Sequence, residues 1–96
     1  MSKHGENRRP TRAAVLSDEF RDDLHYWIDT DRKTALRLIG LMEAVMREPF
    51  SGIGKPEHLK QLRGNIWSRR ISEVDRLVYE VFADRIVFHQ ARYHYG

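Results

Sequence analysis

The last third of the chain combines arginines with a histidine in segments whose β-branched and aromatic residues favour strands. Side chains alternate between the two faces of a strand, so residues of equal parity share a face. The alternation predicts that one face of the sheet carries Arg70, Arg76, Arg92 and His94 together. Four such side chains on one solvated face favour an anion as the ligand of that face.

Cleavage of RNA without a metal ion is one chemistry that these residue types suit. It needs a base for the 2′-hydroxyl proton, an acid for the departing 5′-oxygen, and cations for the charge on phosphorus. Glu57 or His94 could be the base, and His94 could be the acid. Tyr93 or Tyr95 could stack on a base of single-stranded RNA. The cations available for such a site are Lys60, Arg70 and Arg76.

Other chemistries fit the sequence less well. Serine hydrolysis is disfavoured because no nucleophile-elbow motif is present. His89 and His94 lie five residues apart on opposite parities, and the chain has no cysteine, so no metal site is predicted. The run "GIGKPE" (52–57) follows a helical pattern and lacks the spacing of a Walker or dinucleotide loop. We therefore expect neither a metal nor an organic cofactor.

Length and composition indicate one domain. The 96 residues are 41% apolar and 10% aromatic, which is enough for a core. No apolar run is long enough to span a membrane, and "MSKHGENRRPTR" has no apolar stretch typical of a secretory signal. The absence of cysteine fits a reducing cytoplasm. Net charge is +3 over residues 1–12, −3 over 13–53 and +3 over 54–96, so the basic C-terminal part suggests a polyanionic partner.

The first half of the chain predicts two helices that position these residues. Residues 1–12 are expected to form a flexible basic tail, and 13–17 a short strand. Ser17 suits a helix N-cap, and Thr30 or Asp31 can cap a second helix. Apolar residues recur at helical spacing in two stripes, which are Phe20, Leu24, Trp27, Ile28, and then Ala35, Leu38, Ile39, Met42, Val45, Met46. A helical hairpin over about 18–47 follows from this pattern.

The second half predicts a loop followed by three strands. Residues 49–65 contain three Gly and two Pro, which indicates a structured loop. Strands are predicted at 66–72, 76–82 and 86–94, joined by hairpin-length links. The expected fold is therefore α+β, with a two-helix hairpin packed on a small, mainly antiparallel, twisted sheet.

The run "PFSGIGKPEHLKQLRGNIWSRRIS", followed by "RLVYEV" and the closing "RYHY", resembles the Txe/YoeB toxins of bacterial toxin–antitoxin systems, within the RelE-like superfamily. The resemblance spans residues 13–95, and residues 13–96 are taken as one toxin domain. It implies a microbial-RNase-like fold and an endoribonuclease that cuts mRNA in the ribosomal A site. It also implies a YefM/Axe-like antitoxin, contact with operator DNA only through the antitoxin complex, a tendency to dimerise, and a bacterial cytoplasmic location.

Matching motifs carry the family's roles to positions of this chain. The resemblance implies that Glu57 of "GKPE" is the general base and that His94 of "YHY" is the general acid. Arg76 of "RLVY" would stabilise the transition state, and Arg70 of "SRRI" would hold phosphate. The residues implied to orient or bind the substrate are Lys60 of "HLK" and Tyr95.

The chain departs from its family pattern at three places. Val74 and Asp75 stand where relatives often have a glutamate and a histidine, and Asp75 could damp the positive charge of Arg76. Residues 1–12 have no family counterpart, and Gly96 follows the tyrosine at which many relatives stop. For His94 and Tyr95 both to reach a substrate, the chain must turn directly after His94.

Two alternative functions belong to other classes. One is a non-catalytic toxin similar to the ParE branch, which poisons DNA gyrase. That branch lacks the catalytic histidine and its partners, whose presence here disfavours it. The other is a nucleic-acid-binding module without turnover, whose binding would fall steeply with salt.

Overall fold

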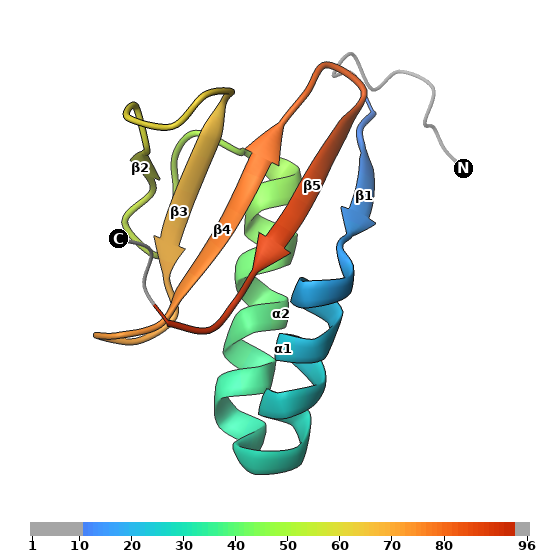
Figure 1. Cartoon of the computed structure of the whole chain (residues 1–96), viewed down its shortest axis with the longest axis vertical. Helices are drawn as coiled ribbons and strands as arrows, with labels where there is room; N and C mark the ends of the chain where they lie inside the picture. Colours follow the sequence, from blue (N-terminus) through green and yellow to red (C-terminus); the bar gives the residue numbers. More distant parts are fainter. Residues whose placement is uncertain (1–10, 94–96) are drawn as a thin grey trace.

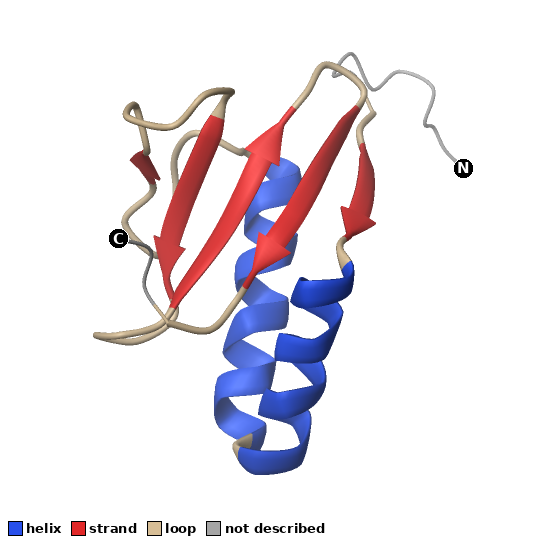
Figure 2. Cartoon of the chain, in the orientation of Figure 1, coloured by secondary structure: helices blue, strands red, loops and turns tan. Residues whose placement is uncertain are grey.

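Two helices cover one face of a five-stranded mixed sheet in the computed structural model, which describes residues 11–93 (Figures 1 and 2). The elements are β1 (Ala13–Leu16), α1 (Asp18–Thr30), α2 (Arg32–Arg47), β2 (Glu57–His58), β3 (Ile66–Arg70), β4 (Arg76–Val81) and β5 (Arg85–Gln90). The strand order is β1-β5-β4-β3-β2, with β1 parallel to β5 and all other neighbours antiparallel. The predicted helical hairpin on a mainly antiparallel sheet is confirmed.

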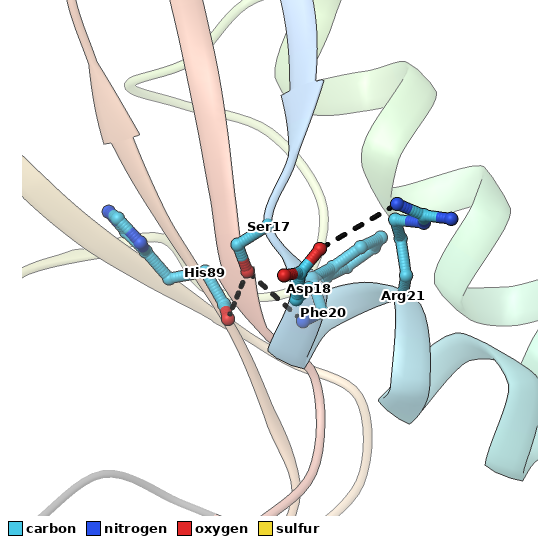
Figure 3. Close-up of polar contacts among 5 residues, drawn as sticks. All are labelled: Ser17, Asp18, Phe20, Arg21 and His89. Atoms are coloured by element: carbon cyan, nitrogen blue, oxygen red, sulfur yellow. Dashed lines mark hydrogen bonds and ion pairs between the residues drawn. The ribbon is translucent and has the colours of Figure 1, made fainter.

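The first helix begins at a cap that also binds the end of the sheet. The Ser17 hydroxyl accepts a hydrogen bond from the amide of Phe20 (3.1 Å) and donates one to the carbonyl of His89 (2.9 Å). Figure 3 shows both contacts, with the His89 imidazole pointing away from the helix. The negative charge of Asp18, in the first turn, interacts favourably with the positive end of the helix dipole. One serine therefore starts α1 and fixes it against β5.

A single residue, Asp31, joins the two helices. Its amide donates to the Trp27 carbonyl (2.8 Å) to close α1, and its carboxylate accepts from the Thr34 amide (3.2 Å) and hydroxyl (2.8 Å) to open α2. These hydrogen bonds from Thr34 hold the pKa of the Asp31 carboxyl below its ordinary value. The reversal needs no longer linker because one side chain caps both helices.

The core lies between the helices and the sheet. Its fully buried side chains are Phe20, Leu38, Leu41, Val45, Leu77, Tyr79, Ile86 and Phe88. The predicted stripes are partly wrong at their margins, because Ile28 is 54% exposed and Ile39 is 38% exposed. In each helix the buried stripe is narrower than the apolar pattern, and Leu41, outside the predicted stripe, is buried instead. The predicted inward orientation of Leu77, Tyr79 and Val81 is confirmed.

A buried cation shapes the loop before β2. The guanidinium of Arg69 is fully buried and donates to the carbonyls of Glu48 (2.6 Å), Ser51 (2.9 Å) and Ile53 (3.2 Å), and to the Tyr79 hydroxyl (3.1 Å). The Tyr79 hydroxyl in turn donates to the Pro49 carbonyl (2.7 Å). Burial raises the pKa of Tyr79, and hydrogen bonding and charge from Arg69 oppose that rise. These bonds fix the segment that leads to Glu57.

The last predicted strand is too long. It was expected over 86–94, whereas β5 ends at Gln90. Beyond it, the Ala91 amide donates to the buried carboxylate of Asp23 (2.8 Å), and the Ala91 carbonyl accepts from the Trp27 indole (2.8 Å). Both backbone groups of Ala91 are thus taken by side chains of α1, so no strand can pair there.

The N-terminal segment is described only from Thr11. The tail predicted over 1–12 therefore lies largely outside the described residues. Arg12 is the exception, because its guanidinium donates to the carbonyl of Phe82 (2.8 Å) in the link between β4 and β5. Among residues 11–93, neither helix is long and apolar enough to cross a membrane.

Candidate active site

The face of the sheet opposite the helices carries a carboxylate–guanidinium pair. β2 pairs with β3 so that Glu57 lies opposite Ser68, and β3 pairs with β4 so that Arg70 lies opposite Arg76. The Nη1 atom of Arg76 is 3.0 Å from Oε1 of Glu57 and 3.4 Å from the Ser68 hydroxyl. Two residues implied as base and transition-state cation are thus in direct contact.

The two partners of this pair differ in exposure. The Glu57 side chain is 62% exposed, whereas that of Arg76 is 20% exposed. Nε of Arg76 is buried and has no hydrogen-bond partner within residues 11–93. Desolvation strengthens the field of a cation, because the surrounding dielectric is lower than that of water. The arrangement presents an accessible carboxylate next to an oriented, partly desolvated positive charge.

The segment after β5 is anchored at Arg76. After leaving β5 the chain runs to the start of β4 (Figure 1). The Arg76 amide then donates to the Tyr93 carbonyl (3.2 Å), and the Tyr93 amide donates to the Asp75 carboxylate (2.6 Å). Tyr93 has φ of +60°, a left-handed conformation, so the backbone turns there. The chain therefore reaches position 93 directly beside the Glu57–Arg76 pair.

The turn that was expected directly after His94 falls outside the described residues, which show an earlier change of direction. The backbone leaves the strand after Gln90 and turns at Tyr93. His94, Tyr95 and Gly96 lie outside the described residues, so their predicted roles are not addressed by the geometry. Asp75, expected to damp the charge of Arg76, directs its carboxylate to the Tyr93 amide and the Ser72 hydroxyl (3.2 Å).

Arg92 does not join the cations on the face of the sheet opposite the helices, which we call the open face. Its guanidinium lies 3.6 Å from the ring centroid of Tyr26 on α1 and 4.8 Å from that of Tyr93, and it donates to the Tyr93 hydroxyl (2.9 Å). The parity argument fails for Arg92 because β5 ends at Gln90 and side chains of α1 bind both backbone groups of Ala91, so strand alternation does not extend to position 92.

Lys60 and Arg70 are the remaining predicted cations. Arg70 is exposed at the end of β3, on the same face as Arg76, which is its register partner. Lys60 is exposed in the turn that follows β2. Neither side chain makes a hydrogen bond or ion pair with a residue in the described range, so both can contact a ligand. The site of described residues thus consists of Glu57 and Arg76, with Arg70 and Lys60 beside them.

Sequence reasoning missed the residues that hold this site in place. Asp75 anchors the Tyr93 amide, Asp23 binds the Ala91 amide, and Arg69 fixes the loop before β2. The two consecutive arginines of "SRR" could have indicated the role of Arg69. Adjacent strand residues face opposite sides, so one of the two arginines had to face the helices.

The fold and the site together define a class. This is a small α+β protein with a helical hairpin on one sheet face and a carboxylate–arginine pair on the other, an arrangement able to move a proton beside a bound phosphate.

Comparison with known proteins narrows the class to a family. Residues 16–95 match the model of the YoeB-like toxin of bacterial type II toxin–antitoxin systems. Toxin YoeB of Mycobacterium bovis is 47% identical over 74 residues, covering 77% of this chain and 87% of that protein. Toxin YoeB of Escherichia coli is 43% identical over 81 residues, covering 84% and 96%. The chain belongs to the YoeB-like toxin family.

Solved structures agree with this assignment. The YoeB dimer from Staphylococcus aureus superposes with a TM-score of 0.79 at 34% identity, over 88% of this chain and 99% of that one. The YoeB–YefM complex from the same organism gives a TM-score of 0.72 at 31% identity, over 88% and 98%. The expected RelE-like arrangement of helices and sheet is confirmed.

Proposed function

We propose that this toxin is a ribosome-dependent endoribonuclease that cleaves mRNA in the ribosomal A site and so stops translation. The observation that supports it most is the 3.0 Å contact between Glu57 and Arg76, with the Tyr93 backbone bound to the same arginine. In this contact a carboxylate and a guanidinium lie beside the segment that leads to a histidine. Family membership supports the same activity.

The reaction follows from the roles of these groups. Glu57 removes the 2′-hydroxyl proton, and the resulting oxygen attacks the adjacent phosphorus. The bond to the 5′-oxygen breaks, and His94 gives that oxygen a proton, leaving a 2′,3′-cyclic phosphate and a 5′-hydroxyl. Arg76 stabilises the charge that builds on the phosphorane. No metal ion or cofactor is needed for these steps.

Substrate binding would reorganise the carboxylate–guanidinium pair. In the free protein Arg76 donates a hydrogen bond to Glu57. This bond orients the carboxylate, but it also occupies a lone pair that the carboxylate needs in order to accept a proton. A phosphate bound by Arg76 and Arg70 would replace this contact and free Glu57 to act as a base. Lys60 and Tyr95 would orient the RNA. Arg92 is left out of the proposed site because its guanidinium lies over Tyr26.

The proposed partners follow from the family and from solved relatives. A YoeB–YefM complex is known from Staphylococcus aureus, which supports a YefM-like antitoxin for this chain. A YoeB dimer from the same organism supports a homodimer. The other proposed partners are the 70S ribosome and its mRNA, in the bacterial cytoplasm. Operator DNA would be contacted only through the antitoxin complex.

Primer extension on mRNA bound to translating ribosomes tests the proposed activity. Glu57→Gln and His94→Gln are each expected to slow A-site cleavage by about a hundredfold or more, since each removes a proton-transfer group. Glu43→Gln, an exposed change on α2, is the charge-matched control for Glu57→Gln and should cut like the wild type.

Each alternative function predicts a different result. Undiminished cutting by both variants would refute the assigned roles. Absence of cleavage by the wild type, together with gyrase-dependent DNA breaks, would favour a ParE-like toxin. Salt-sensitive RNA binding without any shortened RNA would favour a plain binding module.

A further inference from the structure

A cavity of about 400 Å³ lies on the open face of the sheet, lined by residues of β3, β4 and β5, the loop before β3 and the start of α1. Its polar lining comes from Ser17, Glu19, Glu80, His89 and Gln90, and its apolar lining from Leu62, Ile66 and Val78. The volume is within the range of small-molecule sites. None of these side chains takes part in the proposed cleavage chemistry, so the cavity needs its own explanation.

The carboxylate in this cavity is held in one position. Nε2 of His89 lies 3.0 Å from Oε1 of Glu80, whose side chain is 20% exposed. The second oxygen faces the loop before β3, where a Cβ atom added to Gly64 would lie 2.6 Å from Oε2 of Glu80. Gly64 has φ of +99°, so glycine suits both the backbone and the close approach. The Glu80 carboxylate is thus preorganised to accept hydrogen bonds.

The bulge in β5 positions His89 to pair with Glu80. At the register shift, Val78 pairs with Gln90 while Tyr79 pairs with Phe88, so His89 is the extra residue. The Ser17 hydroxyl donates to the His89 carbonyl, and the imidazole extends away from α1 (Figure 3). Its Nε2 atom lies 3.0 Å from Oε1 of Glu80. Two neighbouring residues, His89 and Gln90, consequently line the cavity together.

The open face is therefore divided by charge. Arg70 and Arg76 form its cationic end, and Glu80 lies at the other end with His89. Val78, in the cavity wall, is two residues from Arg76 on β4, which is about 7 Å along a strand. A ligand that fits both ends carries an anion at one end and an uncharged group with N–H donors at the other. A nucleotide has this form.

We propose that this cavity binds a guanine base of the RNA, adjacent to the phosphate held by Arg76; the proposal rests on the endoribonuclease function above. Guanine presents two neighbouring N–H donors, from N1 and the 2-amino group, which one carboxylate can accept side by side. Uracil presents a single N–H between two carbonyl oxygens, which Glu80 would repel. Leu62, Ile66 and Val78 supply apolar contact for the base. The cavity would thus favour guanine at one position of the cleaved codon.

Nucleotide titration of the isolated chain, followed by amide NMR shifts, tests this proposal without a ribosome. Guanosine 3′-monophosphate should bind with Kd on the order of 1 mM and shift the Gly64 and His89 amides. Uridine 3′-monophosphate should bind about tenfold more weakly or beyond detection. Glu80→Gln should abolish the preference for guanine, and Glu80→Asp, which withdraws the charge by one methylene, should reduce it. Glu43→Gln is the charge-matched control and should bind like the wild type.

The outcomes separate this proposal from the proposed function. Equal binding of both nucleotides, shifts confined to Arg70 and Arg76, or no shift at tens of millimolar nucleotide would each overturn the guanine site. Guanine-selective binding that is lost in Glu80→Gln, by a protein that cuts no ribosome-bound mRNA, would uphold the site and refute the endoribonuclease. Cleavage of ribosome-bound messages without any dependence on guanine would do the reverse.

Discussion

Arg69 and Arg76 lie on adjacent strands, on opposite faces of the same sheet. Arg69 faces the helices, is fully buried, and donates to three backbone carbonyls and the Tyr79 hydroxyl. Arg76 faces the open side, contacts the mainly exposed carboxylate of Glu57, and has a buried Nε without a partner in the described part of the chain.

The difference shows how one residue type is used in two ways. The neutral oxygens around Arg69 nearly use up its donors, so that side chain stabilises the loop and has little capacity for a ligand. The donors of Arg76 are incompletely used, and its carboxylate partner is reachable from solvent. An arginine with unused donors beside an accessible acid is the one suited to bind and release a phosphate.

Replacing Arg76 should have the largest effect, and it should fall on activity. Arg76→Gln is expected to lower the rate of A-site mRNA cleavage by about a hundred- to a thousandfold, because it removes the charge that stabilises the transition state. Stability should change little, since an ion pair with an exposed partner contributes about 1 kcal/mol or less. Single-turnover cleavage and thermal unfolding measure the two quantities. A large loss of stability with normal cleavage would reverse our assignment of the two arginines.

Replacing Arg69 should have the opposite signature. Arg69→Met leaves several buried carbonyls without donors, so the free energy of unfolding should fall by about 3 kcal/mol. For a domain of this size, that corresponds to a melting temperature lower by roughly 12 to 24 °C. The matched control is Arg70→Met, one residue further on but exposed, which should alter stability by about 0.5 kcal/mol or less. Equal destabilisation by the two changes would contradict the structural role of Arg69.

The anchor of the C-terminal segment offers a test of intermediate size. Asp75→Ala removes the acceptor of the Tyr93 amide, so hydrogen exchange at Tyr93 should accelerate and cleavage should slow by about tenfold. Glu73→Ala, in the same turn but exposed, serves as the control. If exchange at Tyr93 were unchanged in Asp75→Ala, the anchor would not exist in solution.

The smallest expected effect is the pH dependence of stability that comes from Tyr79, whose hydroxyl is bonded to Arg69. Burial raises the pKa of Tyr79, so the folded protein keeps this proton at a pH where the unfolded chain loses it. The stability from Tyr79 is fully present below pH about 10 and is lost as pH rises through the folded pKa. Urea unfolding between pH about 9 and about 11 measures this slope. Tyr79→Phe should remove the part of the slope that this residue causes; an unchanged slope would mean that Tyr79 is not its source.

Local sequence signals predicted most of the fold. Ser17 and Asp31 mark both helix starts, and the apolar spacing gives the hairpin within a residue of its bounds. Strand alternation correctly placed Leu77 and Tyr79 in the core and Arg70 and Arg76 on one face. These features succeed because each depends on neighbours a few residues apart.

The features that failed depend on distant partners. β2 has only two residues, Glu57 and His58, which pair with Ser68 and Trp67 of β3. A strand this short shows no alternation in the sequence that could predict it. The end of β5 is set by Asp23 and Trp27 of α1, more than sixty residues away in sequence. The bulge at His89 has no local signature either, and the early end of β5 left Arg92 outside the strand alternation on which its predicted position rested. The motif resemblance, unlike strand parity, named Glu57 together with Arg76, and these two side chains are in contact.

The place of β5 in the sheet has a consequence for how the protein is made. β5 follows every other strand in the sequence, yet it lies between β1 and β4. During synthesis β1 cannot join the sheet while β5 is still within the ribosome. Its strand partner, β5, is made some seventy residues after it. Closure of the sheet must therefore follow synthesis of β5. The segment that Asp75 and Arg76 anchor beside Glu57 comes after β5, so it can take its place only then.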